Sequence, residues 1–290
     1  MDALLQFAFS GLTVGAIYGL VALGFTLIFN VSGVVNFAQG EFVMLGGMVT
    51  VFAAAGGMPL PLAALTAILV AVAAGLLLDV LAIGPARRAA PITLIIITIG
   101  AALVIRGLAQ VFFDKEFHKL PGFSGDTPIR IGGAAILSQT FWILLGTAAL
   151  LAGLWWFMTR TLTGKALRAT AANRLAAELV GIDTRVVTTV AFVVSAAIGA
   201  MAGILVTPVT LTNYDVGTML ALKAFVAAVL GGMGHPVGAV VGGLLLGLFE
   251  AFAAGYLSSS YKDAAAIVVL LLVLLTMPNG LFTRRSSERV

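Results

Sequence analysis

Two long apolar runs constrain this chain more than any other feature of its sequence. Residues 131–159 and 186–214 are each 29 residues long, and neither contains a charged side chain. A helix of about 20 apolar residues crosses the roughly 30 Å hydrocarbon core of a bilayer. The polar segment between the two runs is therefore expected outside the membrane, because the flanking spans hold it at one surface.

Similar runs occupy most of the chain, which is 61% hydrophobic and 10% charged, with a mean hydropathy of +1.13. A soluble domain needs a more polar surface. Only helices or closed barrels span lipid, and these runs lack the alternation of barrel strands. We therefore predict an all-α fold, a polytopic membrane helix bundle with a single transmembrane domain over residues 1–290. The expected spans, about eight to nine in number, are residues 4–29, 42–55, 62–83, 92–113, 135–158, 186–207, 220–232, 237–254 and 264–281.

Lysine and arginine collect in three places, and the net charge of +4 is a topology signal, not evidence for nucleic-acid binding. Cytoplasmic loops of membrane proteins are enriched in these residues, so all three places are expected in the cytoplasm. The N-terminus then lies outside if the opening region contributes three spans, whereas a re-entrant segment near Asn36 reduces the count to eight. The basic residues are Arg87 and Arg88; Arg160, Lys165, Arg168, Arg174 and Arg185; and Arg284, Arg285 and Arg289.

The polar segment at residues 164–183 is predicted to be one helix inside a cytoplasmic loop spanning residues 160–185. It places Ala169, Ala172 and Ala176 on one face, and small side chains let another surface approach closely. Glu178 then pairs with a basic residue one turn away, and Gly181 ends the helix. The pattern fits a docking helix for a partner protein, and it equally fits a loop helix that only carries positive charge.

Polar residues within the spans are candidates for function, because charge is costly in lipid. Asn36, Gln39 and Glu41 interrupt the opening apolar region, which fits either a transport pathway or an interfacial loop. Arg106, Lys223 and Glu250 all fall in the external half, where Glu250 pairs with Lys223 or Arg106, or all three serve only structure. The candidate translocation-pathway residues are Asn36, Gln39, Glu41, Arg106, Lys223 and Glu250.

Two other polar residues are interpreted as structural. Asp79 lies about one turn from the end of its span, so snorkelling or helix capping is expected. His235 stands between Gly234 and Pro236 and is expected in a turn. No second histidine or cysteine lies at ligand spacing from it, so no metal site is expected.

Enzyme motifs are missing from the sequence. The chain has no G-x-x-x-x-G-K-[ST] phosphate loop, no H-E-x-x-H zinc motif and no G-x-S-x-G nucleophile elbow. It has no cysteine, which excludes disulfides and thiol chemistry. Asp2 precedes the first span without a basic region, so no cleavable signal peptide is expected.

Several segments carry a family resemblance. Residues 176–182, AAELVGI, resemble the EAA loop of ABC-importer permeases, which fits a groove on the ATPase subunit. The wider pattern resembles the H-type permeases of branched-chain amino acid (leucine, isoleucine, valine) ABC transporters. The segments that carry it are residues 15–20 (GAIYGL) with 22–26 (ALGFT), 35–41 (VNFAQGE), 164–183, 223–234 (KAFVAAVLGGMG) continuing into 236–239 (PVGA), and 261–263 (YKD).

This resemblance implies an ABC-importer permease fold in the bacterial cytoplasmic (inner) membrane. It implies a second permease subunit, two cytoplasmic ATPase subunits and a periplasmic binding protein as partners, with lipid around the bundle. ATP and magnesium would belong to the partner subunits, and this chain itself is expected to need no cofactor and to be no enzyme. The residues that would dock to the ATPase are Ala176, Ala177, Glu178 and Gly181.

Substrate and energy source leave alternatives open. Relatives that move urea, short amides or aromatic acids share these motifs with transporters of branched-chain or other hydrophobic amino acids. Gln39 replaces the histidine usual in the family, and an amide does not titrate near neutral pH. An ion-coupled secondary transporter would need an acidic cluster in mid-membrane, and an intramembrane enzyme would need a catalytic constellation; the sequence provides neither.

Overall fold

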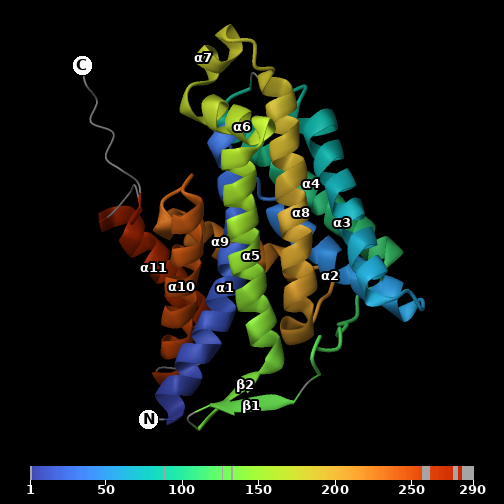
Figure 1. Ribbon diagram of the computed structural model, residues 1–290, viewed down its shortest axis with the longest axis vertical. Coiled ribbons are helices and arrows are strands. Elements are labelled where there is room, and N and C mark those ends of the chain that lie inside the picture. Colours follow the sequence, from blue (N-terminus) through green and yellow to red (C-terminus); the bar gives the residue numbers. More distant parts are fainter. Residues whose placement is uncertain are drawn as a thin grey trace.

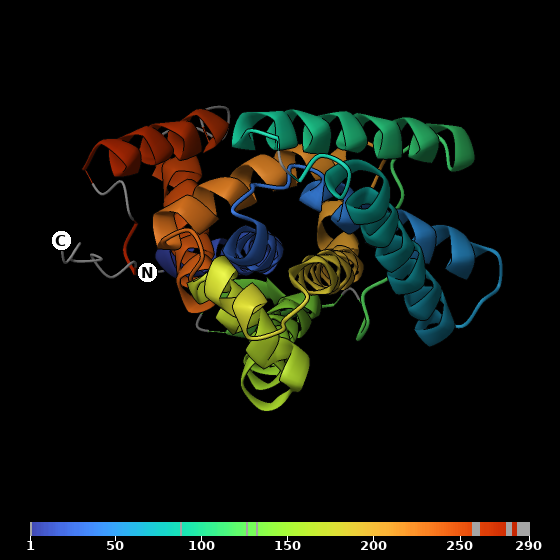
Figure 2. The same cartoon turned by 90° about the horizontal axis from the view of Figure 1, so that it is seen from above.

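The computed structural model describes residues 2–87, 89–125, 127–131, 133–256, 262–276 and 280–282. These residues form an elongated helix bundle built around α1 (Asp2–Ser32), which runs through its centre (Figures 1 and 2). Within the described residues, six helices are long and apolar enough to cross a membrane, and three shorter apolar helices accompany them. The predicted all-α bundle with about eight to nine spans is confirmed.

Glycines fix the contact between α1 and α10 (Pro236–Tyr256). Gly11, Gly15 and Gly19 stand four residues apart in α1, a spacing that predicts a flat face for close helix packing. The structure confirms it, because a Cβ atom on Gly11 would lie 2.7 Å from the Cα atom of Leu248. Gly15 meets Gly243 in the same way, backbone against backbone. Such close approach lets two helices pack without large side chains between them.

Helix α2 (Gln39–Ala55) re-enters the bundle from the end of α1. Gly33 has a φ of 68°, a left-handed conformation that favours glycine and turns the chain back. The Gln39 amide then lies against Gly24, eight residues before the end of α1, or about 12 Å at 1.5 Å per residue. The chain therefore dips into the bundle near Asn36, but α2 does not return to the end where α1 stops. Phe52 near the end of α2 lies against Phe113, just after α4, at the opposite end of the bundle, so the re-entrant alternative is wrong and α1, α2 and α3 give the three predicted crossings.

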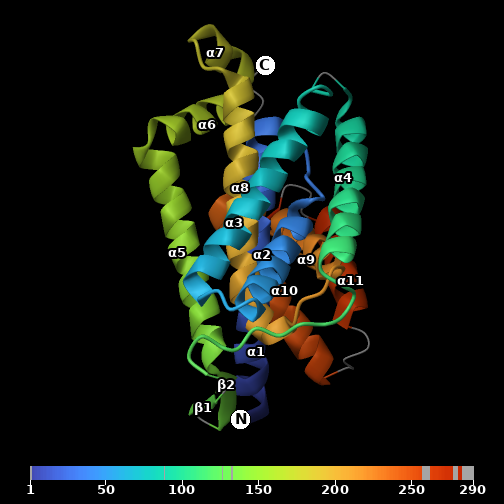
Figure 3. The same ribbon diagram turned by 90° about the vertical axis from the view of Figure 1, so that its right-hand side faces the viewer.

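The next helices form one side of the bundle. Helix α3 (Leu60–Leu77) continues into a π-helical segment, η1 (Leu78–Ile83), and α4 (Pro91–Phe112) follows it. Figure 3 shows α4 and α5 on opposite sides of the bundle. Most side chains of α4 are exposed, and its buried positions, Leu94, Thr98, Ala102 and Ala109, follow one narrow face.

A β-hairpin closes the end of the bundle near the N-terminus (Figure 1). Strands β1 (Pro128–Ile131) and β2 (Ala134–Leu137) are antiparallel, with Pro128 opposite Leu137. The Gln6 side chain of α1 exchanges two hydrogen bonds with the Ala135 backbone. The stretch between the expected spans 92–113 and 135–158 thus contains regular structure that the sequence pattern did not predict.

The polar segment between α5 (Ser138–Arg160) and α8 (Thr184–Thr210) forms two helices, so the prediction of one continuous helix is wrong. Helices α6 (Leu162–Ala172) and α7 (Arg174–Leu179) are separated at Asn173, whose backbone is extended. The Asn173 side chain accepts a hydrogen bond from the Ala176 N–H and so starts a new helix. The predicted stop at Gly181 is confirmed by its φ of 86°.

The C-terminal part contains α9 (Val216–Gly231), α10 and α11 (Lys262–Thr276). Gly232 and Gly234 both have positive φ in the turn between α9 and α10. The predicted turn role of His235 is confirmed, since its Nδ1 accepts a hydrogen bond from the Gly238 N–H at the start of α10. Arg88, Tyr261 and the C-terminal arginines lie outside the described residues.

Candidate translocation pathway and docking surface

Gln39 lies fully buried at the start of α2 and joins three helices. Its Oε1 accepts a hydrogen bond from the Ser195 hydroxyl at 2.6 Å, and its Nε2 donates to the Ser195 carbonyl at 3.2 Å. Ser195 belongs to α8, and its hydroxyl also lies 2.9 Å from the Gly24 carbonyl of α1. Gln39 therefore fastens α2 to α8.

Asn36 lies three residues before Gln39, in the non-helical stretch between α1 and α2. Its Oδ1 accepts a hydrogen bond from the Ala38 N–H, a local turn that sets the start of α2. Its buried Nδ2 has no hydrogen-bond partner. The Phe37 N–H donates to Thr98 of α4, which ties the same stretch to another helix.

Glu41 forms the first of two ion-pair clusters inside the bundle. Its Oε1 lies 2.9 Å from Nη2 of Arg106, and Nη1 of Arg106 lies 3.1 Å from Oδ1 of Asp215. Arg106 belongs to α4 and Asp215 immediately precedes α9, so the cluster links α2, α4 and α9. The pairing of Arg106 with Glu250, one of the two predicted alternatives, is wrong.

The position of Arg106 follows from helical spacing. Thr98 and Ala102 are buried on the inner face of α4, and Arg106 comes four residues after Ala102 on that same face. Its side chain therefore points toward Glu41 instead of toward lipid, as charged groups in membrane helices generally do.

Lys223 and Glu250 form the second cluster, and this predicted pair is confirmed. Nζ of Lys223 lies 3.1 Å from Oε1 of Glu250, which joins α9 to α10. The Tyr18 hydroxyl of α1 donates to Oε2 of Glu250 at 2.7 Å. Lys223 also lies over the Tyr18 ring, 5.4 Å from its centroid, where a cation is attracted by the aromatic face.

Two cavities flank α9, one beside each ion-pair cluster. The first, about 300 Å³, lies between α2, α4 and α9, and the second, about 370 Å³, lies between α1, α9 and α10. The first is lined by Phe37, Glu41, Ile99, Ala102, Leu103, Arg106, Thr218, Ala221 and Leu222. The second is lined by Ser10, Val14, Ile17, Tyr18, Thr210, Leu220, Gly247, Glu250, Ala251 and Ala254.

Asp79 is fully buried in η1, so the expectation that it snorkels is wrong. Both of its carboxylate oxygens accept hydrogen bonds from Arg87, at 3.2 and 3.3 Å. The Thr189 hydroxyl of α8 donates to the same carboxylate. A residue expected to serve only its own helix end thus connects η1, the turn after it and α8.

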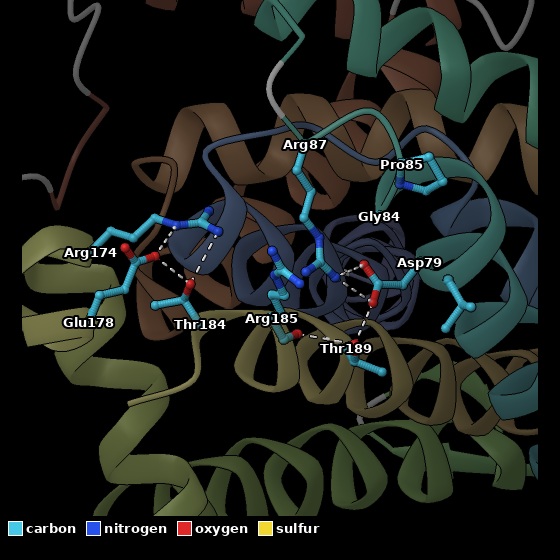
Figure 4. A pocket seen from close by; sticks show the side chains of 10 residues that line it. Asp79, Gly84, Pro85, Arg87, Arg174, Glu178, Thr184, Arg185 and Thr189 are labelled. Carbon is cyan, nitrogen blue, oxygen red and sulfur yellow. Dashed lines mark hydrogen bonds and ion pairs between the residues drawn. The ribbon is translucent and has the colours of Figure 1, made fainter. Parts of the chain in front are cut away.

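A cleft of about 970 Å³ opens at this end of the bundle (Figure 4). Figure 4 shows Asp79 and Arg87 on one side and Glu178 with Arg174 and Thr184 on the other. Arg87 therefore shares one end of the bundle with the basic segment of α6 and α7, as the predicted cytoplasmic placement requires.

Glu178 of α7 accepts a hydrogen bond from the Thr184 hydroxyl at 2.6 Å. Arg174, one turn earlier, lies 3.5 Å from the same carboxylate, which confirms the predicted pair. The Thr184 hydrogen bond and then the Arg174 guanidinium hold the pKa of Glu178 below its usual range. The contact fixes α7 on the first turn of α8.

The surface of α7 exposes large apolar side chains that the sequence analysis did not single out. Leu175 is 69% exposed, Leu179 81% and Val180 76%, and Figure 1 shows α7 projecting beyond the bundle. Ala176, Glu178 and Gly181 are also exposed, whereas Ala177 is buried and holds α7 in place. The available signal was the helical spacing of Leu175 and Leu179 in a segment too polar to enter lipid.

The family model described as the branched-chain amino acid transport system permease component matches residues 7–277. The permease protein LivH of the high-affinity branched-chain amino acid transport system in Escherichia coli K12 is 34% identical, covering 99% of this chain and 97% of LivH. The corresponding protein BraD of Pseudomonas aeruginosa is 33% identical, with 99% and 98% covered. A probable LivH of Methanocaldococcus jannaschii is 28% identical, with 90% and 87% covered.

Proposed function

This chain belongs to the family of branched-chain amino acid transport permeases, and from that premise we propose that it moves branched-chain or other hydrophobic amino acids inward. It is a multi-pass permease of the inner membrane, a component of an ABC transport system. Separate ATPase subunits, which hold ATP and magnesium, drive alternating access between outward-open and inward-open states. A second permease subunit and a periplasmic binding protein complete the importer.

The exposed apolar surface of α7 is the observation that carries the ATPase-docking part of this proposal. Leu175, Leu179 and Val180 are exposed on α7 and directly after it, and α7 projects beyond the basic end of the bundle (Figure 1). Isolated exposed leucines are ordinary, but a group of them on a projecting helix marks a protein interaction site. The docking surface is therefore Leu175, Ala176, Glu178, Leu179, Val180 and Gly181, with Ala177 beneath it.

Motion at α7 reaches the membrane through α8. Glu178 holds α7 to Thr184 in the first turn of α8, and Ser195 lies eleven residues further along that helix. At 1.5 Å per residue, Ser195 is about 16 Å away, where it meets Gln39 of α2. A pull on α7 when the ATPases close would thus shift α2 through one rigid helix.

Co-purification with the cognate ATPase tests the docking role. We expect wild type to retain the ATPase in mild detergent, and Leu179→Asp, Glu178→Lys and Gly181→Asp each to lose most of it. Leu137→Asp, a similar change at an exposed leucine of β2 at the opposite end of the bundle, should retain it fully. Equal retention by wild type and all three docking variants would refute the proposed surface.

A further inference from the structure

The first turns of α2 and α9 meet inside the bundle. Gly40 and Gly217 are each the second residue of their helix, and a Cβ atom on Gly217 would lie 2.6 Å from the Gly40 carbonyl oxygen. The helices have 17 and 16 residues, fewer than the about 20 of a full span. In transporters, the N-termini of short or interrupted helices carry partial positive charge and point toward anionic groups of the substrate.

The charged groups beside this junction have unused hydrogen-bonding capacity. Glu41 is 1% exposed, and its Oε2 is buried without a hydrogen-bond partner. The Nε of Arg106 is buried without one as well. A buried carboxylate oxygen that accepts no hydrogen bond costs free energy, so binding of a ligand that donates a hydrogen bond to this oxygen is favoured. One acceptor for an ammonium group and one donor for a carboxylate thus lie side by side.

The cavity next to them has the dimensions and walls for an aliphatic side chain. Its volume of about 300 Å³ is at the low end of the roughly 300–1,000 Å³ typical of small-molecule sites. Ile99, Leu103 and Leu222 supply apolar walls, while Thr218 adds a hydroxyl. Asp215, which pairs with Arg106, is 56% exposed, and a carboxylate facing hydrocarbon would be costly, so the surface around Asp215 faces water or protein.

We propose that Glu41 and Arg106 bind the α-ammonium and α-carboxylate groups of an amino acid in transit. The cavity between α4 and α9 then takes its aliphatic side chain. This assignment rests on the proposed function, and it gives the permease a selectivity of its own for zwitterions with an apolar side chain. Urea lacks both charged groups and would gain nothing from this site.

The structure shows this site closed. The backbones of Gly40 and Gly217 are in contact, and Oε2 of Glu41 lies against Gly217. Arg106 meanwhile bridges Glu41 and Asp215. Separation of α9 from α2 exposes Oε2 of Glu41 and frees Arg106 from Asp215, so that substrate replaces an internal contact. Access to the site is thereby coupled to the relative movement of two helices.

Thiol protection in the reconstituted importer tests the assignment, because the chain has no cysteine of its own. Thr218→Cys places a reactive thiol in the proposed cavity. Ser10→Cys places a matched thiol in the cavity on the other side of α9. We expect L-leucine to slow thiosulfonate labelling of Thr218→Cys and not of Ser10→Cys. Equal protection of both positions, or of neither, would overturn the proposal.

The chemistry of the site is resolved by pairing ligands with variants. 4-Methylpentanoate is leucine without its ammonium group. To protect Thr218→Cys as well as leucine does, it should need a concentration on the order of 10- to 100-fold higher, as expected for the loss of a charged hydrogen bond. In the Thr218→Cys background, Glu41→Gln should weaken protection by leucine to that level and leave protection by 4-methylpentanoate unchanged. Arg106→Lys should weaken protection by both ligands. Equal effects of Glu41→Gln on the two ligands would overturn the role of Glu41.

Two controls separate failure of this site from failure of the proposed function. Retention of the ATPase subunits shows that each variant is folded and assembled. ATP-driven leucine uptake by the cysteine-free wild type shows that leucine is a substrate. Leucine uptake without protection at Thr218→Cys would refute the site alone, whereas absence of uptake of leucine and of other hydrophobic amino acids would refute the proposed function.

Discussion

Nζ of Lys223 lies 3.1 Å from Oε1 of Glu250, inside the bundle and next to the Tyr18 hydroxyl. The pair joins α9 to α10 by a contact between residues 27 positions apart. Both side chains are largely removed from solvent, so each charge depends on the other for compensation.

Removal of one partner of this pair should be more damaging than removal of both. Lys223→Met leaves Glu250 charged and unpaired, and we expect it to lower the free energy of unfolding by about 3–5 kcal/mol. The double variant Lys223→Met/Glu250→Gln should recover most of that loss. Thermal unfolding in detergent measures both, and a double variant no more stable than the single one would contradict the pairing.

The glycine contact between α1 and α10 should tolerate no added side chain. A Cβ atom on Gly247 would overlap the backbone of Gly15, so Gly247→Ala forces the helices apart and should destabilise by about 1–3 kcal/mol. Gly153 of α5 has open space around it, and Gly153→Ala should stabilise its helix by up to about 1 kcal/mol. Urea or thermal unfolding of the two variants should therefore give opposite signs.

The buried amide of Gln39 should contribute through both of its hydrogen bonds to Ser195. Gln39→Leu keeps the approximate volume but leaves the Ser195 carbonyl without this donor, at a cost of about 1–3 kcal/mol. The double variant Gln39→Leu/Ser195→Ala also removes the Ser195 hydroxyl. Comparison with the two single variants in a double-mutant cycle measures the coupling between Gln39 and Ser195. Additive losses in melting temperature would show that the two residues act independently.

The lowered pKa of Glu178 gives its contact with Thr184 a definite pH dependence. A depressed carboxyl pKa contributes stability above the usual carboxyl range, which is lost as the pH falls through the lowered value. Thr184→Val removes the largest cause and should move the pKa upward. Carbon NMR of labelled glutamate measures it, since the chain has five glutamates and Glu178→Gln identifies the signal. An unchanged midpoint would exclude the Thr184 bond as the cause.

Local spacing predicted the contacts that depend on one helix face. Glycines four residues apart in α1 predicted close packing, and the depths of Lys223 and Glu250 in their spans predicted their pair. The break at Asn173 was missed because the pattern of small residues continues through it. The sequence did contain a signal for this break, because asparagine is a favoured N-cap residue and Asn173 can start a new helix.

Contacts that depend on the path of the whole chain were not predicted. Arg106 pairs with Glu41, 65 residues away, because α2 re-enters the bundle beside α4. Asp79 is buried because Thr189, 110 residues later, lies beside η1. Local composition gives no sign of either contact, because each one depends on which helices pack beside each other in the folded chain.

ATP-driven uptake of L-leucine into proteoliposomes tests the central claim most directly. The claim predicts accumulation above the external concentration when this chain, its second permease, the ATPases, the binding protein and ATP are all present. It predicts no accumulation when the ATPases are left out or when Leu179→Asp disrupts docking. Concentrative uptake by this chain alone, without any ATPase, would contradict the account.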